Sequence, residues 1–155
     1  MAEFRLQLLL EHARERSESA ARELQRLRHQ WTLAEEKIKQ LQQYLSDYHD
    51  RLNDTSATGM TVGDMRDFQR FIAKLELAIR SQSEEVVRCR ERWEAGQRDW
   101  AEREREVKAY DALRQRHERE EMHKENKRDQ RLQDEFSQNQ RLRRAKEDTK
   151  DDSTE

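Results

Sequence analysis

The most regular feature of the chain is a row of apolar residues spaced alternately three and four positions apart between residues 65 and 110. Such a heptad pattern predicts a long helix with an apolar seam too narrow for a globular core, so a second helix must lie along it. Only Gln82 and Arg103 interrupt the apolar character. The seam consists of Met65, Phe68, Ile72, Leu75, Ile79, Gln82, Val86, Cys89, Trp93, Gly96, Trp100, Arg103, Val107 and Tyr110.

The same alternation occurs earlier in the chain, with Ser17 as its one polar member. Two seams of similar length joined by a short connector predict an all-α fold, an antiparallel two-helix coiled-coil hairpin. We expect helices over about residues 3–52 and 62–140, a turn at 53–61, and one domain over residues 1–144. The first seam consists of Leu6, Leu10, Ala13, Ser17, Ala20, Leu24, Leu27, Trp31, Ala34, Ile38, Leu41, Leu45, Tyr48 and Leu52.

The connector supplies its own turn signals. Gly59 can adopt a positive φ at low cost, and Thr61 is placed to cap the second helix, with Asp64 three residues later. If the turn sets the register, the numbers of facing residues sum to about 117.

That register makes specific predictions about the indole rings. It places Trp100 opposite Ser17, Trp93 near Leu24 and Ala20, and Gly96 near Ala21, so that bulky rings meet small partners.

After Tyr110 the apolar seam fades. The first helix has run out of residues there, so the second helix is expected to project beyond it as an overhang. Leu132, Phe136 and Leu142 are the remaining apolar anchors of this segment. Residues 145–155 are charged and polar and are expected to form a disordered tail.

Composition excludes several classes of protein. Of the residues 43% are charged, proline is absent, and the net charge is −2 with both signs interspersed; a nucleic-acid binder would carry a basic face. Cys89, the one cysteine, lies on the seam and is interpreted as a small hydrophobe, which suits a reducing cytoplasm. No signal peptide or membrane-inserting segment is expected, and the hairpin is expected to be a monomer.

No pattern in the chain indicates catalysis. The three glycines are isolated, so no phosphate-binding loop forms, and the histidines lack the spacing of metal ligands on a helix. Acidic residues on an open helical surface have no pocket to desolvate them. We therefore expect a protein that is not an enzyme and has neither metal nor cofactor.

A few apolar residues lie beside the seam rather than on it. Tyr44, Phe71 and Ala78 occupy heptad position g, where Glu or Lys is usual. The expected register sets Tyr44 beside Phe71, and Lys37 beside Ala78. Two interpretations stay open: the rings widen the seam locally, or they form a docking patch with aromatic anchors.

Two ordered motifs carry a family resemblance. Residues 68–79 read FQRFIAKLELAI, which is similar to the aromatic-Gln-x-Phe-Ile-x-x-Leu-Glu-x-Ala-Ile run of the flagellar type III export protein FliJ family. Residues 125–130 read ENKRDQ, and residues 134–136 read DEF, which is similar to that family's Glu-Asn-x-x-Asp-Gln…Asp-Glu-Phe. The Tyr44 and Tyr48 pair before the turn and the Gly59-Met60-Thr61 tip also resemble the family.

The resemblance implies a cytoplasmic, non-catalytic component peripheral to the inner-membrane export apparatus. It implies a stalk in the pore of the export ATPase FliI ring that promotes its assembly and activity. Further implied partners are the export gate FlhA, a FliH-type ATPase regulator and export chaperones. The implied gate contacts are Leu41, Tyr44, Tyr48, Phe71, Leu75 and Ala78. The implied ATPase contacts are Asn126, Asp129, Gln130 and Phe136.

Two other functions remain open at this point. The equivalent stalk of a virulence type III secretion system would share the hairpin, but the motif over residues 125–136 favours the flagellar member. A generic structural coiled-coil tether would share the heptads but has no need of the aromatic residues beside the seam.

Overall fold

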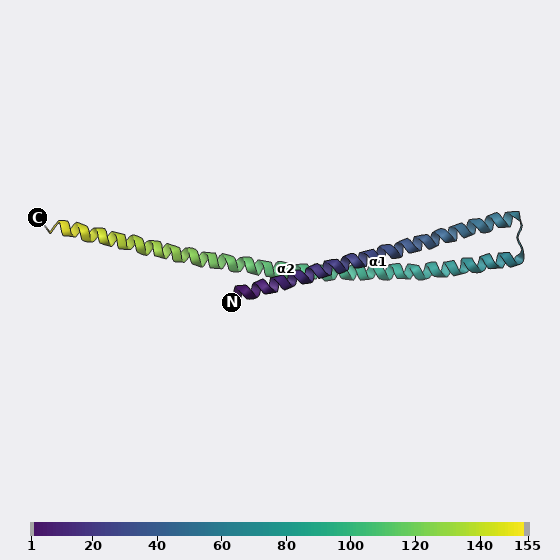
Figure 1. Ribbon diagram of the computed structural model, residues 1–155, viewed down its shortest axis with the longest axis horizontal. Coiled ribbons are helices and arrows are strands. Elements are labelled where there is room, and N and C mark those ends of the chain that lie inside the picture. Colours follow the sequence, from purple (N-terminus) through teal and green to yellow (C-terminus); the bar gives the residue numbers. More distant parts are fainter. Residues whose placement is uncertain (1, 154–155) are drawn as a thin grey trace. The chain divides into compact units, whose positions relative to one another are not determined.

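The computed structural model describes the backbone of residues 2–153 and the side chains of residues 4–153. Within that range it contains two helices and no strand, α1 (Ala2–Thr58) and α2 (Val62–Asp151), joined by residues 59–61 (Figure 1). The prediction of an all-α helical hairpin is confirmed. In the described part of the chain neither helix has a stretch long and apolar enough to cross a membrane.

The connector is shorter than the sequence pattern predicts. We expected α1 to end near Leu52, but it continues to Thr58. Residues 53–58 contain neither glycine nor proline, so nothing breaks the helix before Gly59. Gly59 follows directly after the last helical residue, and its φ of 104° turns the backbone out of the helix.

The start of α2 follows the expected capping pattern. The backbone N–H of Asp64 donates to the hydroxyl oxygen of Thr61 at 3.1 Å. This contact satisfies one of the amides that the first turn of a helix leaves without a partner, so Thr61 is the N-cap.

The end of α2 also differs from expectation. The helix runs to Asp151 rather than to about residue 140, and residues 145–151 are helical where a disordered tail was expected. Ala145, Lys146 and Glu147 are favourable helix formers, and no proline or glycine interrupts them. The rest of the expected tail includes Thr154 and Glu155, which lie outside the described residues.

The contacts divide the chain into two compact units, which we call the turn unit (residues 12–107) and the terminal unit (residues 1–11 and 108–155). In the turn unit α1 and α2 run antiparallel on either side of the connector (Figure 1). Every α1 seam position from Leu6 to Leu52 is buried or half-buried, so the three-four pattern identifies the packed face correctly. The α2 seam follows the same rule, except that Trp100 is partly exposed.

The register of the turn unit is close to the expected one, but the partners of the large side chains differ. Trp93 lies against Trp31, with ring centroids 5.2 Å apart, which is a ring contact that the expected register did not predict. A Cβ at Gly96 would lie 2.8 Å from Leu27 Cδ1 and 3.5 Å from Leu24 Cδ1, so Gly96 accommodates leucines rather than Ala21.

The physical reason is the direction of helical side chains, which lean toward the N-terminus of their own helix. In an antiparallel pair the two sets lean in opposite directions along the interface. Two long side chains on opposite helices therefore meet when their residue numbers sum to more than the value of about 117 expected for facing residues. Trp31 and Trp93 are such a pair.

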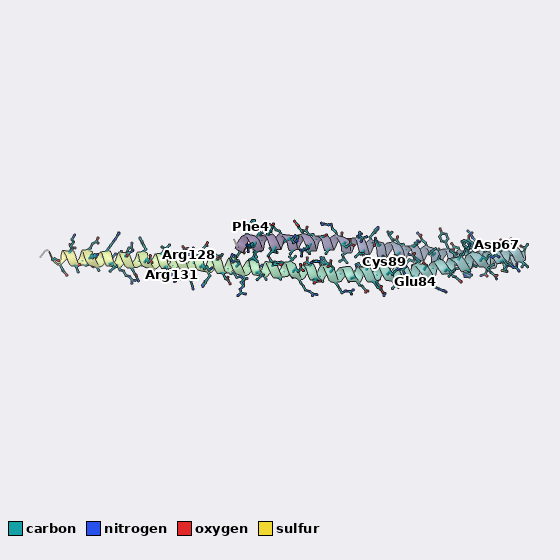
Figure 2. All side chains as sticks on the ribbon, turned by 90° about the horizontal axis from the view of Figure 1, so that it is seen from below. Phe4, Asp67, Glu84, Cys89, Arg128 and Arg131 are labelled. Carbon is teal, nitrogen blue, oxygen red and sulfur yellow. The ribbon has the colours of Figure 1, made fainter. Side chains whose placement is uncertain are left out.

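The terminal unit contains little buried surface. On its α1 segment Leu10 is completely buried and Leu6 is half-buried. On its α2 segment every side chain from residue 118 to residue 153 is exposed, Arg128 and Arg131 among them (Figure 2).

Candidate partner-binding surfaces

The six residues expected to contact an export gate lie in the turn unit. Leu75 is buried, and Leu41 and Tyr48 are half-buried on the seam. The other three, Tyr44, Phe71 and Ala78, are exposed. The set therefore divides into side chains that hold the two helices together and side chains that a second protein can reach.

The aromatic rings of this region are not paired as predicted. Phe71 lies against Tyr48, with ring centroids 4.2 Å apart and planes tilted by 35°. Tyr48 also meets the edge of Phe68, at 6.3 Å between centroids. Tyr44 is 58% exposed and makes no ring contact within the described residues, so its expected pairing with Phe71 is wrong.

The lean of helical side chains explains this exchange of partners as well. Phe71 leans toward the start of α2, and therefore toward the connector. Tyr44 leans toward the start of α1, and therefore away from the connector. The two side chains diverge, and Tyr48, one turn of α1 nearer the connector, meets Phe71 instead.

Tyr48, Asp67, Phe68 and Phe71 line a shallow hollow beside the connector. The guanidinium of Arg51 lies 5.4 Å from the centre of the Tyr48 ring. We call Tyr44 together with these four hollow-lining residues the aromatic surface. Of its rings, Tyr44 and Phe71 are the most accessible, at 58% and 39% exposed.

Two polar contacts made by buried seam residues join the helices, and sequence reasoning did not anticipate either of them. Gln82 is buried, and its side-chain amide donates to the backbone carbonyl of Ala34 at 3.0 Å. The hydroxyl of Ser17, also buried, donates to the carboxylate of Glu104. Their positions on an otherwise apolar seam were the available signal, since a buried polar side chain needs a partner.

Cys89 is buried in the seam, as predicted (Figure 2). Burial raises the pKa of its thiol, and the neighbouring Glu85 carboxylate, which accepts a hydrogen bond from the Cys89 sulfur at 3.6 Å, raises it further. The thiol therefore stays protonated at neutral pH, which suits a packing role rather than a nucleophilic one.

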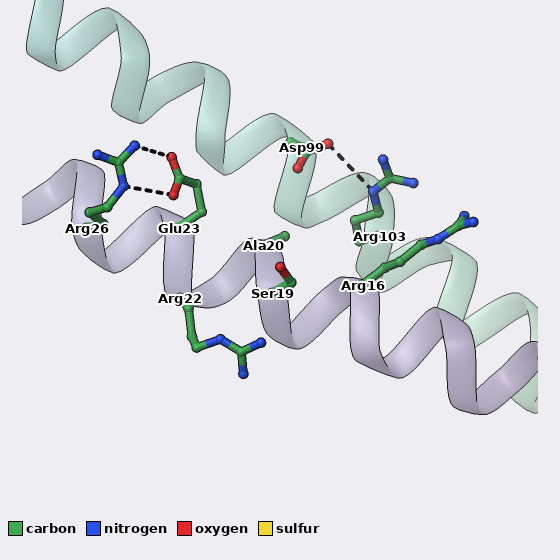
Figure 3. Close-up of a pocket in the computed structure, with 8 residues that line it drawn as sticks. All are labelled: Arg16, Ser19, Ala20, Arg22, Glu23, Arg26, Asp99 and Arg103. Carbon is green, nitrogen blue, oxygen red and sulfur yellow. Dashed lines mark hydrogen bonds and ion pairs between the residues drawn. The ribbon is translucent and has the colours of Figure 1, made fainter.

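A charged groove lies along the turn unit (Figure 3). Glu23 accepts two hydrogen bonds from Arg26, at 2.8 and 2.5 Å, and these bonds lower the pKa of the Glu23 carboxyl. Arg103 approaches Asp99 at 3.7 Å. Both pairs are accessible to solvent and each lies within a single helix, so they contribute little to stability. In residues 2–153 no three His, Cys, Asp or Glu side chains gather as metal ligands would.

The four residues expected to contact an ATPase lie on the exposed part of α2 in the terminal unit. Asn126, Asp129, Gln130 and Phe136 all face solvent, and Phe136 is 65% exposed. The other large apolar side chains of this segment are equally uncovered: Met122, Leu132 and Leu142. This segment, residues 118–153, we call the exposed segment.

Comparison with known proteins identifies the family. The family model described as "Flagellar FliJ protein" matches residues 1–146. The chain belongs to the FliJ family. It is similar to the flagellar FliJ protein of Escherichia coli (strain K12), with 30% identity over 139 residues, 90% of this chain and 95% of that protein. It is also similar to the flagellar FliJ protein of Salmonella typhi, with 28% identity over the same shares of the two chains. No solved structure matches the chain.

Membership of the FliJ family makes this chain a structural component of flagellar protein export. Among the functions left open by the sequence, it favours the flagellar component over a virulence counterpart or a generic tether. The match covers both the aromatic surface and most of the exposed segment of this chain.

Proposed function

We propose that the chain is the non-catalytic stalk of the flagellar export apparatus. The exposed segment inserts in the ring of the export ATPase FliI and promotes its assembly and activity. The aromatic surface contacts the export gate FlhA. A FliH-type regulator and export chaperones are its further partners, and its place is cytoplasmic, peripheral to the inner membrane.

The observation that carries this proposal is the exposed segment of α2. A single helix in water gains little from its own hydrogen bonds, and most helical stability in proteins comes from packing. Phe136 and Leu132 are among the side chains that nothing covers within the described residues. Large apolar groups on a helix of otherwise polar composition are the usual anchors of a binding partner.

The main experiment measures ATP turnover by the purified cognate export ATPase with and without this protein. The full chain should stimulate turnover, and a chain truncated after His117, the last half-buried residue, should not. Because every described residue that the truncation removes, 118–153, is exposed, the packed seam of the remaining helices is retained.

Point variants make the same test without truncation. Phe136→Ala together with Leu132→Ala should reduce stimulation severalfold. Val62→Ala is the matched control, because Val62 is even more exposed but lies at the start of α2. Equal stimulation by all three proteins would contradict an ATPase contact at the exposed segment.

The gate contact has its own matched variants. Tyr44→Ala removes an exposed ring that makes no ring contact in the structure, so a loss of FlhA binding would report the interface rather than packing. Leu77→Ala, at a similarly exposed position on α2, is the control. Phe71→Ala also removes the contact with Tyr48, so its effect is interpreted only beside a measurement of stability.

Crosslinking decides which unit meets which partner. Photoreactive groups at Asn126 and Phe136 should crosslink to the ATPase. Crosslinks from both positions to the gate alone would refute the proposed assignment. Gate binding without any stimulation of the ATPase would leave a role as an escort of export chaperones.

A further inference from the structure

The α1 seam contains a run of small residues between Leu24 and Leu10. Ala13, Ser17 and Ala20 occupy three successive seam positions, and all three are buried. Burying an alanine or serine removes much less apolar surface from water than burying a leucine. This stretch, which we call the small-residue step, therefore holds the two helices together only weakly.

The part of α2 that meets the small-residue step contributes polar contacts beside the apolar Trp100 and Val107. Ser17 donates to Glu104, and Arg16 approaches Glu106 at 4.0 Å. Arg103, which occupies a seam position, lies 3.5 Å from Glu106. The side chains of Arg103 and Glu106 are about one-third exposed, so water screens these ion pairs and they add little stability.

The seam on the connector side of the step is packed differently. Trp31 and Trp93 are in ring contact, and the guanidinium of Arg28 lies 4.3 Å from the centre of the Trp31 ring. Farther toward the connector Gln82 bonds to the backbone of Ala34, and Leu75 is buried. The large rings and the buried apolar side chains hold this part of the hairpin closed.

On the other side of the step the packing depends on few residues. Leu10 is completely buried and Leu6 is half-buried within the terminal unit. The boundary between the two compact units, at residues 11–12 of α1 and 107–108 of α2, borders the small-residue step.

We propose that the pairing of α1 with α2 outward of Leu24 opens and recloses by itself while the inner seam remains closed. The small-residue step and the polar side chains of Arg103 and Glu104 set how easily it opens. Each opening uncovers the apolar side chains of Leu6 and Leu10, which the closed hairpin hides. This local opening is a property of the chain without any partner, so its test involves neither the ATPase nor the gate.

Two matched cysteine variants test the opening. Cys89 is first replaced by alanine, so that each variant carries a single thiol at the position under test. Ala13→Cys and Ala34→Cys are then made separately; both alanines are buried, at 3% and 7% exposed, and both changes are small. The rate of alkylation by iodoacetamide reports how often each site opens.

The thiol at position 13 should react at least about tenfold faster than the thiol at position 34 in the absence of denaturant. Its rate should also be insensitive to low urea, whereas the rate at position 34 should follow global unfolding. Equal rates at the two positions, rising together with urea, would overturn the proposal.

A second variant tests the role of the polar side chain on α2. Arg103→Leu extends the apolar seam and should slow alkylation at position 13 severalfold. Gln82→Leu is the control, because it makes the same kind of change inside the inner seam, and it should leave the rate at position 13 unchanged. No slowing by Arg103→Leu would contradict the proposed control.

Hydrogen exchange of the unaltered chain covers the case in which a cysteine disturbs folding. Amides of residues 5–16 should exchange much faster than those of residues 27–48. Uniform protection over both ranges would likewise overturn the proposal.

Discussion

At the scale of single residues, the seam shows how a coiled coil accommodates positions that break its apolar pattern. Gln82 stays buried because its amide reaches the carbonyl of Ala34 on the other helix. That carbonyl lies inside α1, so it already has a helical hydrogen-bond partner, and the side-chain bond is an additional one. A buried polar contact of this kind contributes more to the choice of register than to stability.

The Gln82 position allows a prediction about stability. Gln82→Leu should leave the free energy of unfolding unchanged or raise it by up to about 1 kcal/mol, because apolar burial offsets the lost hydrogen bond. Gln82→Ala should lower it by about 1–2 kcal/mol, because it leaves a cavity as well. Urea unfolding followed by circular dichroism measures both. A loss in the leucine variant as large as that in the alanine variant would contradict this account.

Gly96 is a seam residue that has no side chain and so leaves room for leucines of the other helix. A Cβ there would lie 2.8 Å from Leu27 Cδ1, so an alanine obliges that leucine to move. Alanine is the better helix former by about 1 kcal/mol.

The two effects at Gly96 separate in a double-mutant comparison. Gly96→Ala should raise the free energy of unfolding by about 1 kcal/mol when Leu27 is already alanine, and by clearly less when Leu27 is present. Equal effects in the two backgrounds, measured by urea unfolding, would show that Leu27 does not limit the space.

At the scale of elements, the glycine that ends α1 should tolerate substitution less well than the glycine in the first turn of α2. Gly59 adopts a φ of 104°, which side chains other than glycine rarely adopt, while no atom lies within 4 Å of the place a Cβ would take. Gly63 lies in the first turn of α2 with helical backbone. A Cβ placed there would lie 3.9 Å from Thr61 Oγ1, which is an ordinary contact distance.

The same substitution at these two glycines should therefore have opposite effects. Gly59→Ala should lower the free energy of unfolding by about 1 kcal/mol through backbone strain. Gly63→Ala should raise it by up to about 1 kcal/mol through helix propensity. Thermal unfolding of the two variants beside the wild-type protein measures both signs, and a stabilising Gly59→Ala would refute the strain argument.

At the scale of the whole molecule, burial is distributed very unevenly. The largely or wholly buried side chains belong to the seam, and all residues from 118 to 153 are exposed. Nearly a quarter of the chain therefore adds helix without adding packed surface, which is costly unless the segment serves a partner.

Truncation after His117 tests this distribution of stability. The urea midpoint of the remaining chain should equal that of the full chain, because no side chain among the removed residues 118–153 is buried. The ellipticity per molecule should fall as the exposed helix is lost. A clearly lower midpoint would mean that the exposed segment supports the packed seam.

The sequence alone was sufficient to identify the packed faces of both helices. A three-four alternation leaves only one face apolar, and burial of that face is the dominant stabilising term, so the seam positions from Leu6 to Leu52 could be named in advance. The turn and capping residues of the connector indicated the cap at Thr61 and the positive φ of Gly59, although the turn was expected to begin at residue 53. The motifs over residues 68–79 and 125–136 were enough to suggest the family.

Only the tertiary structure decided which side chains meet. Heptad numbering treats each residue as a point on its helix axis, whereas a real side chain leans toward the start of its helix by an amount that depends on its length. For that reason Phe71 meets Tyr48 instead of Tyr44, and Trp93 meets Trp31. The structure also showed where the helices end. Residues 53–58 and 145–151 are helical because neither range contains a glycine or proline that would stop the helix.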